Sequence, residues 1–155
     1  ATMMYGHGET VDDRVEHFRR VRDLQDELGG FYAYVPWSFA PGGTPLGRKL
    51  KGLRAQANDY LRIIAAARLY FDNVDHVDAS WFSEGKKTGQ VALHFGADDF
   101  GGTLFDENVM QEAGHYVRTS VDEMQVMIRE AGFVPAQRNT QYDVLEVFDT
   151  DPLSA

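Results

Sequence analysis

Aromatic, carboxylate and glycine residues gather in four short segments of the sequence, each directly after an apolar stretch: residues 5–9, 36–44, 81–85 and 98–103. Aromatic rings give a planar ligand a surface to stack on, and carboxylates accept hydrogen bonds from sugar hydroxyl groups. Glycines let a ligand approach the backbone closely. These residue types therefore suit a flat organic ligand that carries hydroxyl groups, such as a nucleoside. The aromatic and acidic candidates are Trp37, Phe39, Trp81, Glu9, Asp98 and Asp99.

Each candidate also has an ordinary structural explanation. A tryptophan such as Trp37 or Trp81 is more often part of a core or its rim than of a ligand site. The pair Asp98-Asp99 could equally well cap the start of a following turn. The residue types alone leave both interpretations open. The positions of these residues on the predicted strands and helices are therefore needed to choose between a ligand site and a structural role.

Several other kinds of site are disfavoured. The Gly6-His7-Gly8 stretch lacks the third glycine and the acidic partner of a dinucleotide fingerprint. The absence of cysteine removes disulfides, thiolate zinc sites and thiolate-held iron–sulfur clusters from this chain. The histidines show no metal-ligand spacing, so no metal site is expected, and only the first of them falls in one of the four segments: His7, His17, His76, His94 and His115.

Short apolar runs alternate with longer amphipathic ones, which is typical of α/β folds with parallel strands. Strands are predicted over residues 1–6, 31–35, 76–82 and within 97–104, with a further extended segment over 142–148. Helices are predicted from Thr10 to Gly29, over 58–71 and 87–95, and from Ser120 to Gly132, where Thr10 and Ser120 open capping boxes. The loop over residues 36–55 is long enough to suggest a functional role.

Composition sets further limits. The chain has 155 residues and a formal net charge of -9, which disfavours nucleic acid and anionic membrane surfaces as partners. No apolar run approaches the roughly 20 residues of a membrane span, and nothing resembles a signal peptide. A cytoplasmic location is the expectation that follows.

The first strand begins at residue 1, which indicates a chain cut inside a larger fold. Four strands alternating with helices suit half of an eight-stranded barrel, and the exposed sheet edges of such a half need a partner. We expect that partner to be the missing amino-terminal half or a second copy. Residues 1–118 would form the half-barrel, and residues 119–155 a helix and an extended tail packed on it.

Several motifs go beyond patterning. They lie at residues 2–9, 36–39, 41–46, 79–81, 96–103 and 131–138. In order and spacing they resemble the radical S-adenosylmethionine (SAM) enzymes of the futalosine pathway over nearly the whole chain. Within that family the sequence is most similar to the cyclic dehypoxanthinyl futalosine synthases of menaquinone biosynthesis, because Trp37 follows Pro36 and Trp81 follows Ser80. Alternatives are aminofutalosine synthase, a relative of the deazaflavin (FO) synthase subunit, or a cluster-free nucleoside-binding module.

The resemblance implies a fold, cofactors and a reaction. The fold would be the carboxyl-terminal half of a (β/α)8-type radical SAM barrel, with four parallel βα units plus terminal helices. The cofactors would be SAM and a [4Fe–4S] cluster whose cysteines lie in the amino-terminal half, outside this chain. Cleavage of SAM would supply the radical with which the full-length enzyme cyclises dehypoxanthine futalosine, and this half alone would be inactive.

The resemblance also implies roles for individual residues. Met4 and Gly6 would lie against the adenine of SAM, with Pro36 beside them and Glu9 fixing the turn. From their position at the last predicted strand, and not from the resemblance, Asp98 and Asp99 are the candidate catalytic residues, which would hold substrate hydroxyls or take the final proton. The substrate-binding set would be His7, Trp37, Phe39, Ser80, Trp81 and Thr103.

Overall fold

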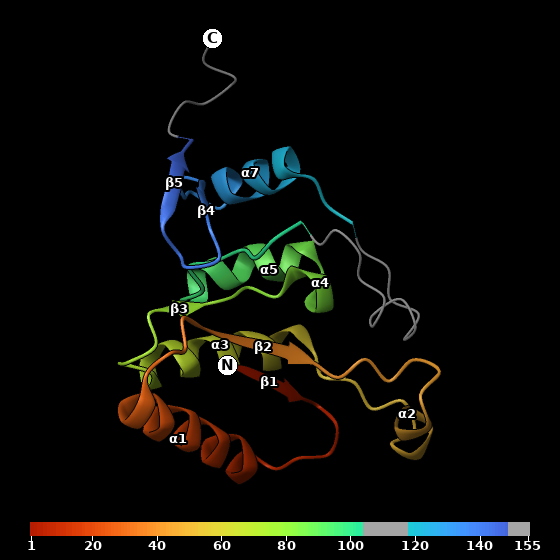
Figure 1. The fold of residues 1–155 in the computed structure, drawn as a ribbon. Coiled ribbons are helices and arrows are strands. Elements are labelled where there is room, and N and C mark those ends of the chain that lie inside the picture. The colour runs from red at the N-terminus through yellow and green to blue at the C-terminus, as the bar shows by residue number, and fades with distance from the viewer. Residues whose placement is uncertain (104–117, 149–155) are drawn as a thin grey trace. The chain divides into compact units, whose positions relative to one another are not determined.

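The structure, a computed structural model, describes residues 1–103 and 118–148 (Figure 1). The chain divides into two compact units, residues 1–118 and 119–155. The first unit contains a three-stranded parallel sheet and the helices that follow its strands, and the second contains a helix and a two-stranded antiparallel sheet.

The sheet of the first unit is parallel throughout. Its strands are β1 (Thr2–Tyr5), β2 (Ala33–Ser38) and β3 (His76–Val77), in the order β1-β2-β3. Met4 is opposite Trp37 in the register of β1 and β2, and Tyr34 is opposite Val77 in that of β2 and β3. Since all three strands run the same way, their carboxyl ends meet at one edge of the sheet, as predicted.

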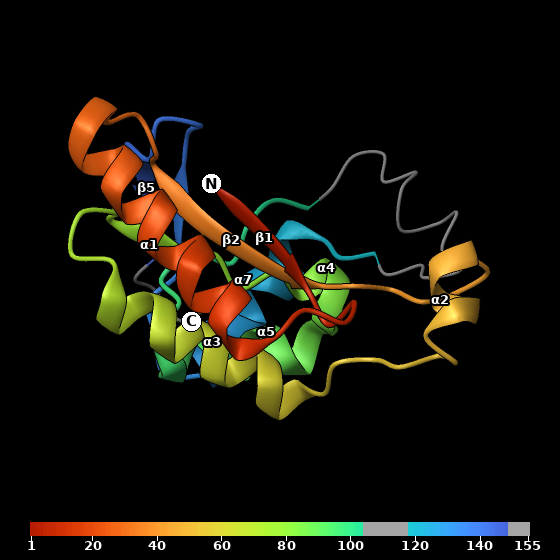
Figure 2. The same cartoon turned by 90° about the horizontal axis from the view of Figure 1, so that it is seen from below.

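Helices connect the strands. The connection from β1 to β2 is α1 (Val11–Leu28), and β2 leads through the short α2 (Pro45–Lys49) to α3 (Ala57–Tyr70). After β3 come α4 (Trp81–Glu84), α5 (Lys86–Ala92) and the 3-10 turn η1 (Leu93–Phe95). Figure 2 shows α1 and α3 lying alongside the strands. The predicted capping box of α1 is present, since the Thr10 side chain accepts from the Asp13 amide and Asp13 accepts from the Thr10 amide.

An aromatic core packs one face of this sheet against the helices. The Tyr34 ring lies 5.4 Å from that of Phe18 of α1 and 4.7 Å from that of Phe71 at the end of α3. All three side chains are buried. Side chains alternate between the two faces of a strand, and paired residues share a face. Met3, Tyr5, Pro36 and Ser38 therefore belong to the covered face with Tyr34, while Thr2, Met4, Val35 and Trp37 belong to the opposite, open face.

Two predicted strands are shorter than the sequence suggested. The strand over residues 76–82 ends at Val77, because the Asp78 carboxylate accepts the Ser80 amide at 2.7 Å and turns the chain into α4. Residues 97–103 contribute only an isolated parallel bridge between Asp78 and Asp99. There the Asp99 carboxylate accepts the Gly101 amide at 2.6 Å, and Gly101 has a φ of +72°, so the chain turns away. The expectation of four parallel strands is right for three of them, and residue 104 lies outside the described residues.

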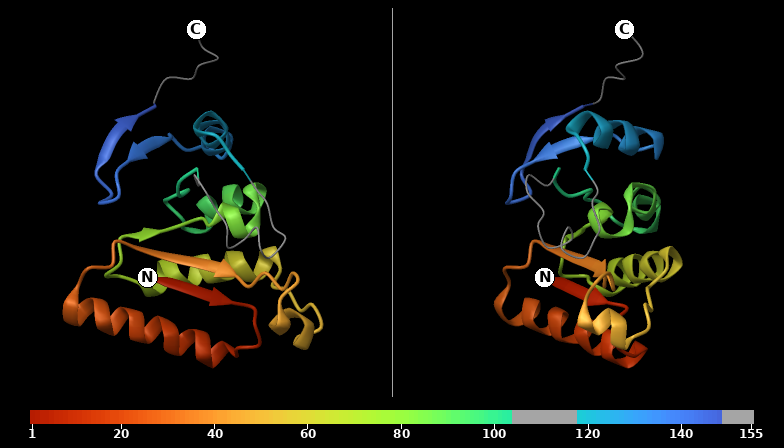
Figure 3. Two further views of the ribbon diagram at one scale, coloured as in Figure 1. Left: turned by 45° about the vertical axis from the view of Figure 1, so that its right-hand side comes forward. Right: turned by 90° about the vertical axis from the view of Figure 1, so that its right-hand side faces the viewer.

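The second unit is built on α7 (Val121–Glu130), which Ser120 caps by accepting the Glu123 amide. The buried side chains of this unit include Met124, Met127, Ala131 and Pro135. A hairpin follows, in which β4 (Ala136–Arg138) pairs antiparallel with β5 (Val144–Val147) (Figure 3). The helix and β5 were predicted. No strand was predicted at β4, because Ala136, Gln137 and Arg138 show no strand-like alternation.

None of the described helices is long and apolar enough to cross a membrane.

Candidate functional site

Met4 and Trp37 form the centre of the candidate site. They are directly opposite each other on β1 and β2, and both belong to the open face of the sheet. Met4 is 36% exposed and Trp37 is half-buried, in contrast to the fully buried Tyr5 and Tyr34 on the other face. The structure therefore brings together one predicted cofactor residue and one predicted substrate residue, on a thioether and an indole surface suited to a planar ring.

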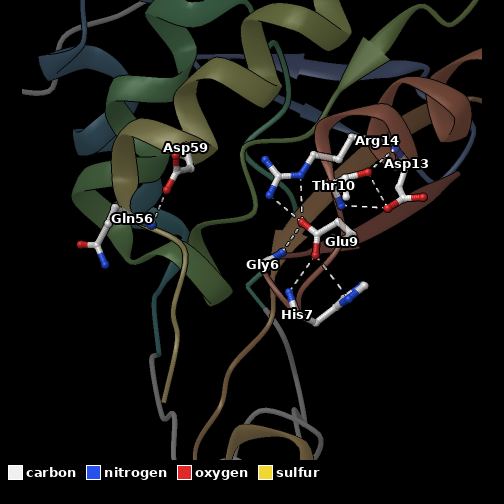
Figure 4. A network of polar contacts seen from close by, with 8 residues as sticks. All are labelled: Gly6, His7, Glu9, Thr10, Asp13, Arg14, Gln56 and Asp59. Carbon is white, nitrogen blue, oxygen red and sulfur yellow. Dashed lines mark hydrogen bonds and ion pairs between the residues drawn. The ribbon is translucent and has the colours of Figure 1, made fainter. Parts of the chain in front are cut away.

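The turn after β1 is held by Glu9. Its carboxylate accepts the amides of Gly6 at 2.7 Å and His7 at 2.8 Å, and pairs with the Arg14 guanidinium at 2.6 Å (Figure 4). Burial opposes ionisation, but these amides and Arg14 lower the pKa of Glu9 to about 2. The carboxylate is thus engaged with its own turn, which is the fixing role that the sequence analysis assigned to it.

Gly6 is required at this turn. Its φ is +82°, where side chains are disfavoured, and a Cβ atom added to it would come within 3.0 Å of the Ala55 Cβ. Ala55 closes the loop that follows β2, so this contact ties the loop to the end of β1. His7 is half-buried beside Gly6, and its Nδ1 lies 3.3 Å from the Glu9 carboxylate. Gly6 and His7 therefore border the carboxyl edge of the open face.

The structure places three other predicted residues in the packed interior. Pro36 is fully buried on the covered face, opposite Met3 and away from Trp37. Phe39 is buried just beyond the end of β2, where its amide bonds to the Tyr5 carbonyl at 2.7 Å. Trp81 is 1% exposed. A Cβ atom added to Gly89 of α5 would come within 2.9 Å of the Trp81 Cβ, so the Trp81 backbone packs tightly against that helix.

Ser80 is also fully buried, and it links β3 to α4. Its amide and hydroxyl donate to the Asp78 carboxylate at 2.7 and 3.3 Å. Thr103 is half-buried and lies at the last described residue of its segment. Neither Ser80 nor Thr103 lies on β1 or β2, the strands that carry Met4 and Trp37.

The two adjacent aspartates have different surroundings. The Asp98 amide bonds to the Val77 carbonyl at 3.1 Å, and its carboxylate reaches back toward the amino end of β3, where it accepts the Val77 amide at 2.8 Å and contacts His76 at 2.7 Å. It also pairs with Arg68 near the end of α3. Asp99 is 8% exposed and bridges to Asp78, at the carboxyl end of the same strand. The structure thus brings only Asp99 toward the carboxyl edge and gives Asp98 a set of structural partners.

Two carboxylates at this edge were missed by the sequence analysis. Asp78 is 7% exposed and directly follows β3, and its position after an apolar strand was a signal that could have found it. Glu84 ends α4 and accepts the Ser38 amide at 2.7 Å, at the tip of β2. No local pattern connects Glu84 with Ser38, because the two are 46 residues apart in sequence.

Metal ligands are not grouped in this part of the molecule. Among residues 1–103 and 118–148, no three histidine, aspartate or glutamate side chains lie close enough together to hold a metal ion. The whole sequence contains no cysteine. Thiolate ligands for a cluster would have to come from outside this chain.

The fold and the site define a class of protein: a parallel α/β unit whose candidate ligand surface lies at the carboxyl ends of its strands. Residues 28–150 match the sequence model of the CofH/MqnC C-terminal region. The chain therefore belongs to this family, the carboxyl-terminal region of a group of radical SAM enzymes. The family resemblance found in the motifs is confirmed.

Three relatives indicate the range of the family. Cyclic dehypoxanthine futalosine synthase of Streptomyces coelicolor is 47% identical over 98% of this chain and 37% of its own length. A 5-amino-6-(D-ribitylamino)uracil–L-tyrosine 4-hydroxyphenyl transferase of Methanosarcina acetivorans is 42% identical over 95% of this chain and 41% of its own. Aminodeoxyfutalosine synthase of Thermus thermophilus is 38% identical over 96% and 41%. The chain thus spans about two fifths of the length of these relatives.

Proposed function

We propose that this chain is the substrate-side, carboxyl-terminal half of a radical SAM barrel that cyclises dehypoxanthine futalosine. The choice of this substrate rests on the 47% identity to a cyclic dehypoxanthine futalosine synthase over nearly the whole chain. The half-barrel is supported by three consecutive parallel strands with their helices on one face. In such a barrel the open face of the sheet, with Met4 and Trp37, is the inner wall.

The partner in this proposal is the amino-terminal half of the same protein. In the sheet that the described residues form, β1 is an edge strand, and an exposed sheet edge needs a neighbour. Val11 and Val15 lie one turn apart on the following helix α1 and are 71% and 54% exposed. A preceding strand and helix would cover both features. A second copy of the chain is the alternative.

The chain's own residues would bind and orient the reactants. Met4 and Gly6 would hold the adenine of SAM at the end of β1, and Trp37 would stack on the substrate opposite Met4. SAM with its reduced cluster supplies the hydrogen-abstracting radical chemistry when both are bound. Exclusion of water from the open face and alignment of the two ligands are the protein's contribution. Asp99, buried at the carboxyl edge, is the candidate to hold the proton lost as the product ring forms.

The test is turnover by the full-length protein, reconstituted with its cluster under anaerobic conditions. We expect the cyclic product from dehypoxanthine futalosine. Formation of aminodeoxyfutalosine instead, or of the tyrosine-derived product of the ribitylaminouracil transferase, would reassign the chain to one of the other two relatives. A nucleoside that binds without any turnover, in a protein whose amino-terminal half has no cysteine motif, would support the cluster-free binding module.

A further inference from the structure

Strand β2 is longer than its neighbour β3, and among residues 1–103 and 118–148 no strand pairs with the remaining part of that edge. The amides of Val35 and Phe39 bond to the β1 side, at 2.8 and 2.7 Å from the carbonyls of Ala1 and Tyr5. The backbone N–H and C=O groups of the even-numbered residues of β2 point toward β3 instead. There the Tyr34 carbonyl accepts the Asp78 amide at 3.0 Å. Pro36 has no amide hydrogen. The next donor on this edge is Ser38, two residues further on.

Glu84 takes the place of the missing strand. Its Oε1 accepts the Ser38 amide at 2.7 Å, and the Ser83 hydroxyl lies 3.2 Å from the same oxygen. Ser38 itself is 3% exposed, so without Glu84 its amide would be a buried donor with no acceptor. One side-chain carboxylate therefore performs the work of a backbone carbonyl at the tip of β2.

The element that carries Glu84 is firmly anchored. Ser80, the residue directly before helix α4, is bound to Asp78, and the first helical residue Trp81 is 1% exposed. The chain leaves α4 at Gly85, whose φ is +86°. Glu84 is thus the last residue of a one-turn helix whose start is bound to Asp78 and whose first residue is buried, and it is not part of an irregular loop.

Glu84 also acts on the buried tyrosine at the tip of β1. Burial, and then the charge of Glu84, raise the pKa of Tyr5. The carboxylate that accepts the Ser38 amide at the tip of β2 therefore also lies within electrostatic reach of Tyr5 at the tip of β1.

We infer that Glu84 is a positioning residue for ligand binding: by holding the Ser38 amide it sets the direction in which Trp37 leaves the end of β2. This inference rests on the proposed function only in taking Trp37 as the surface on which the nucleoside stacks. A glutamine at position 84 keeps the acceptor oxygen, whereas a leucine of similar size removes it.

The experiment compares the full-length wild-type protein with Glu84→Leu and Glu84→Gln, and with Glu27→Leu on the exposed side of α1 as matched control. Amide hydrogen exchange of the peptide that contains Ser38 is the readout independent of activity. We expect at least about tenfold faster exchange at Ser38 in Glu84→Leu and little change in the other two variants, with α1 amides protected in all. Equal protection of Ser38 in Glu84→Leu would overturn the inference.

The functional readout is the KM for the nucleoside substrate beside kcat. Glu84→Leu is expected to raise KM about tenfold with a smaller change in kcat, and Glu84→Gln is expected to restore the wild-type KM. If Glu84→Gln is as impaired as Glu84→Leu, the charge and not the acceptor matters, and the positioning role is wrong. If wild type itself turns over no dehypoxanthine futalosine, the proposed function fails while the exchange result still tests Glu84.

Discussion

The two faces of the parallel sheet are built for different purposes. The covered face packs the buried Tyr34 ring against those of Phe18 and Phe71 at 5.4 and 4.7 Å. The open face presents Met4 and Trp37 as a partly exposed pair. The same four-residue register thus provides a packed core on one side and, in the function proposed, a ligand surface on the other. Substitutions on the two faces should therefore separate the free energy of unfolding from ligand affinity.

The largest effect is expected on the covered face. Tyr34→Ala removes a fully buried ring from the aromatic core and should lower the free energy of unfolding by about 3–5 kcal/mol. Denaturant unfolding of the full-length protein measures it. A loss below about 1 kcal/mol would show that this face does not carry the stability of the unit. It would thereby contradict the proposed difference between the two faces of the sheet.

Substitution of Glu9 is expected to lower the free energy of unfolding by less than Tyr34→Ala and by more than Trp37→Ala. Because its folded pKa of about 2 is below the ordinary value of 4.5, Glu9 stabilises the fold above pH 4.5, and this contribution is lost as the pH falls toward 2. Glu9→Gln should therefore cost about 2 kcal/mol at pH 7 and progressively less on acidification. Unfolding curves between pH 7 and pH 3 test this, with Glu27→Gln on exposed α1 as control. A pH-independent difference would contradict it.

On the open face, Trp37→Ala is expected to weaken binding of the nucleoside substrate about tenfold while the free energy of unfolding falls by only about 1 kcal/mol. Isothermal titration or KM measurement gives the first quantity, and denaturant unfolding gives the second. Equal affinity of the two proteins would remove Trp37 from the ligand surface. A destabilisation as large as that of Tyr34→Ala would mean that both faces are structural.

The smallest effect is expected at Asp98. Its carboxylate is 41% exposed and is engaged with Arg68 and His76 at the amino end of β3. Asp98→Asn should change kcat less than about twofold and lower the free energy of unfolding by about 1 kcal/mol or less. Asp99→Asn provides the contrast, since Asp99 is buried at the carboxyl edge. A loss of turnover confined to Asp98→Asn would restore the catalytic role that the sequence analysis gave it.

Local signals in the sequence predicted most of the elements. The Thr10 capping box and the glycines after Leu28 fixed both ends of α1 to the residue. The alternation of strands and helices indicated the parallel sheet, and the motifs indicated the family that residues 28–150 match. These features depend on neighbouring residues, whose pattern is visible in a single sequence.

Features that depend on distant residues could not be predicted. Trp81 looked like a ligand residue because it follows an apolar stretch, but packing against Gly89 buries it. Asp98 looked equivalent to Asp99 in the sequence, but its hydrogen bond with Arg68, 30 residues away, gives the two carboxylates different surroundings. Met4 and Trp37 were both predicted as site residues, yet only the register of β1 and β2 shows that they are opposite each other.

At the tip of β2 a side chain, and not a neighbouring strand, accepts the backbone hydrogen bond. This has a consequence for the evolution of such a protein. The hydrogen bonds of a strand ladder join main-chain groups, so a mutation other than to proline rarely alters their geometry. The bond from Ser38 to Glu84 depends on one codon. This corner of the sheet is therefore where a single point mutation could retune the fit of a new ligand while leaving the aromatic core untouched.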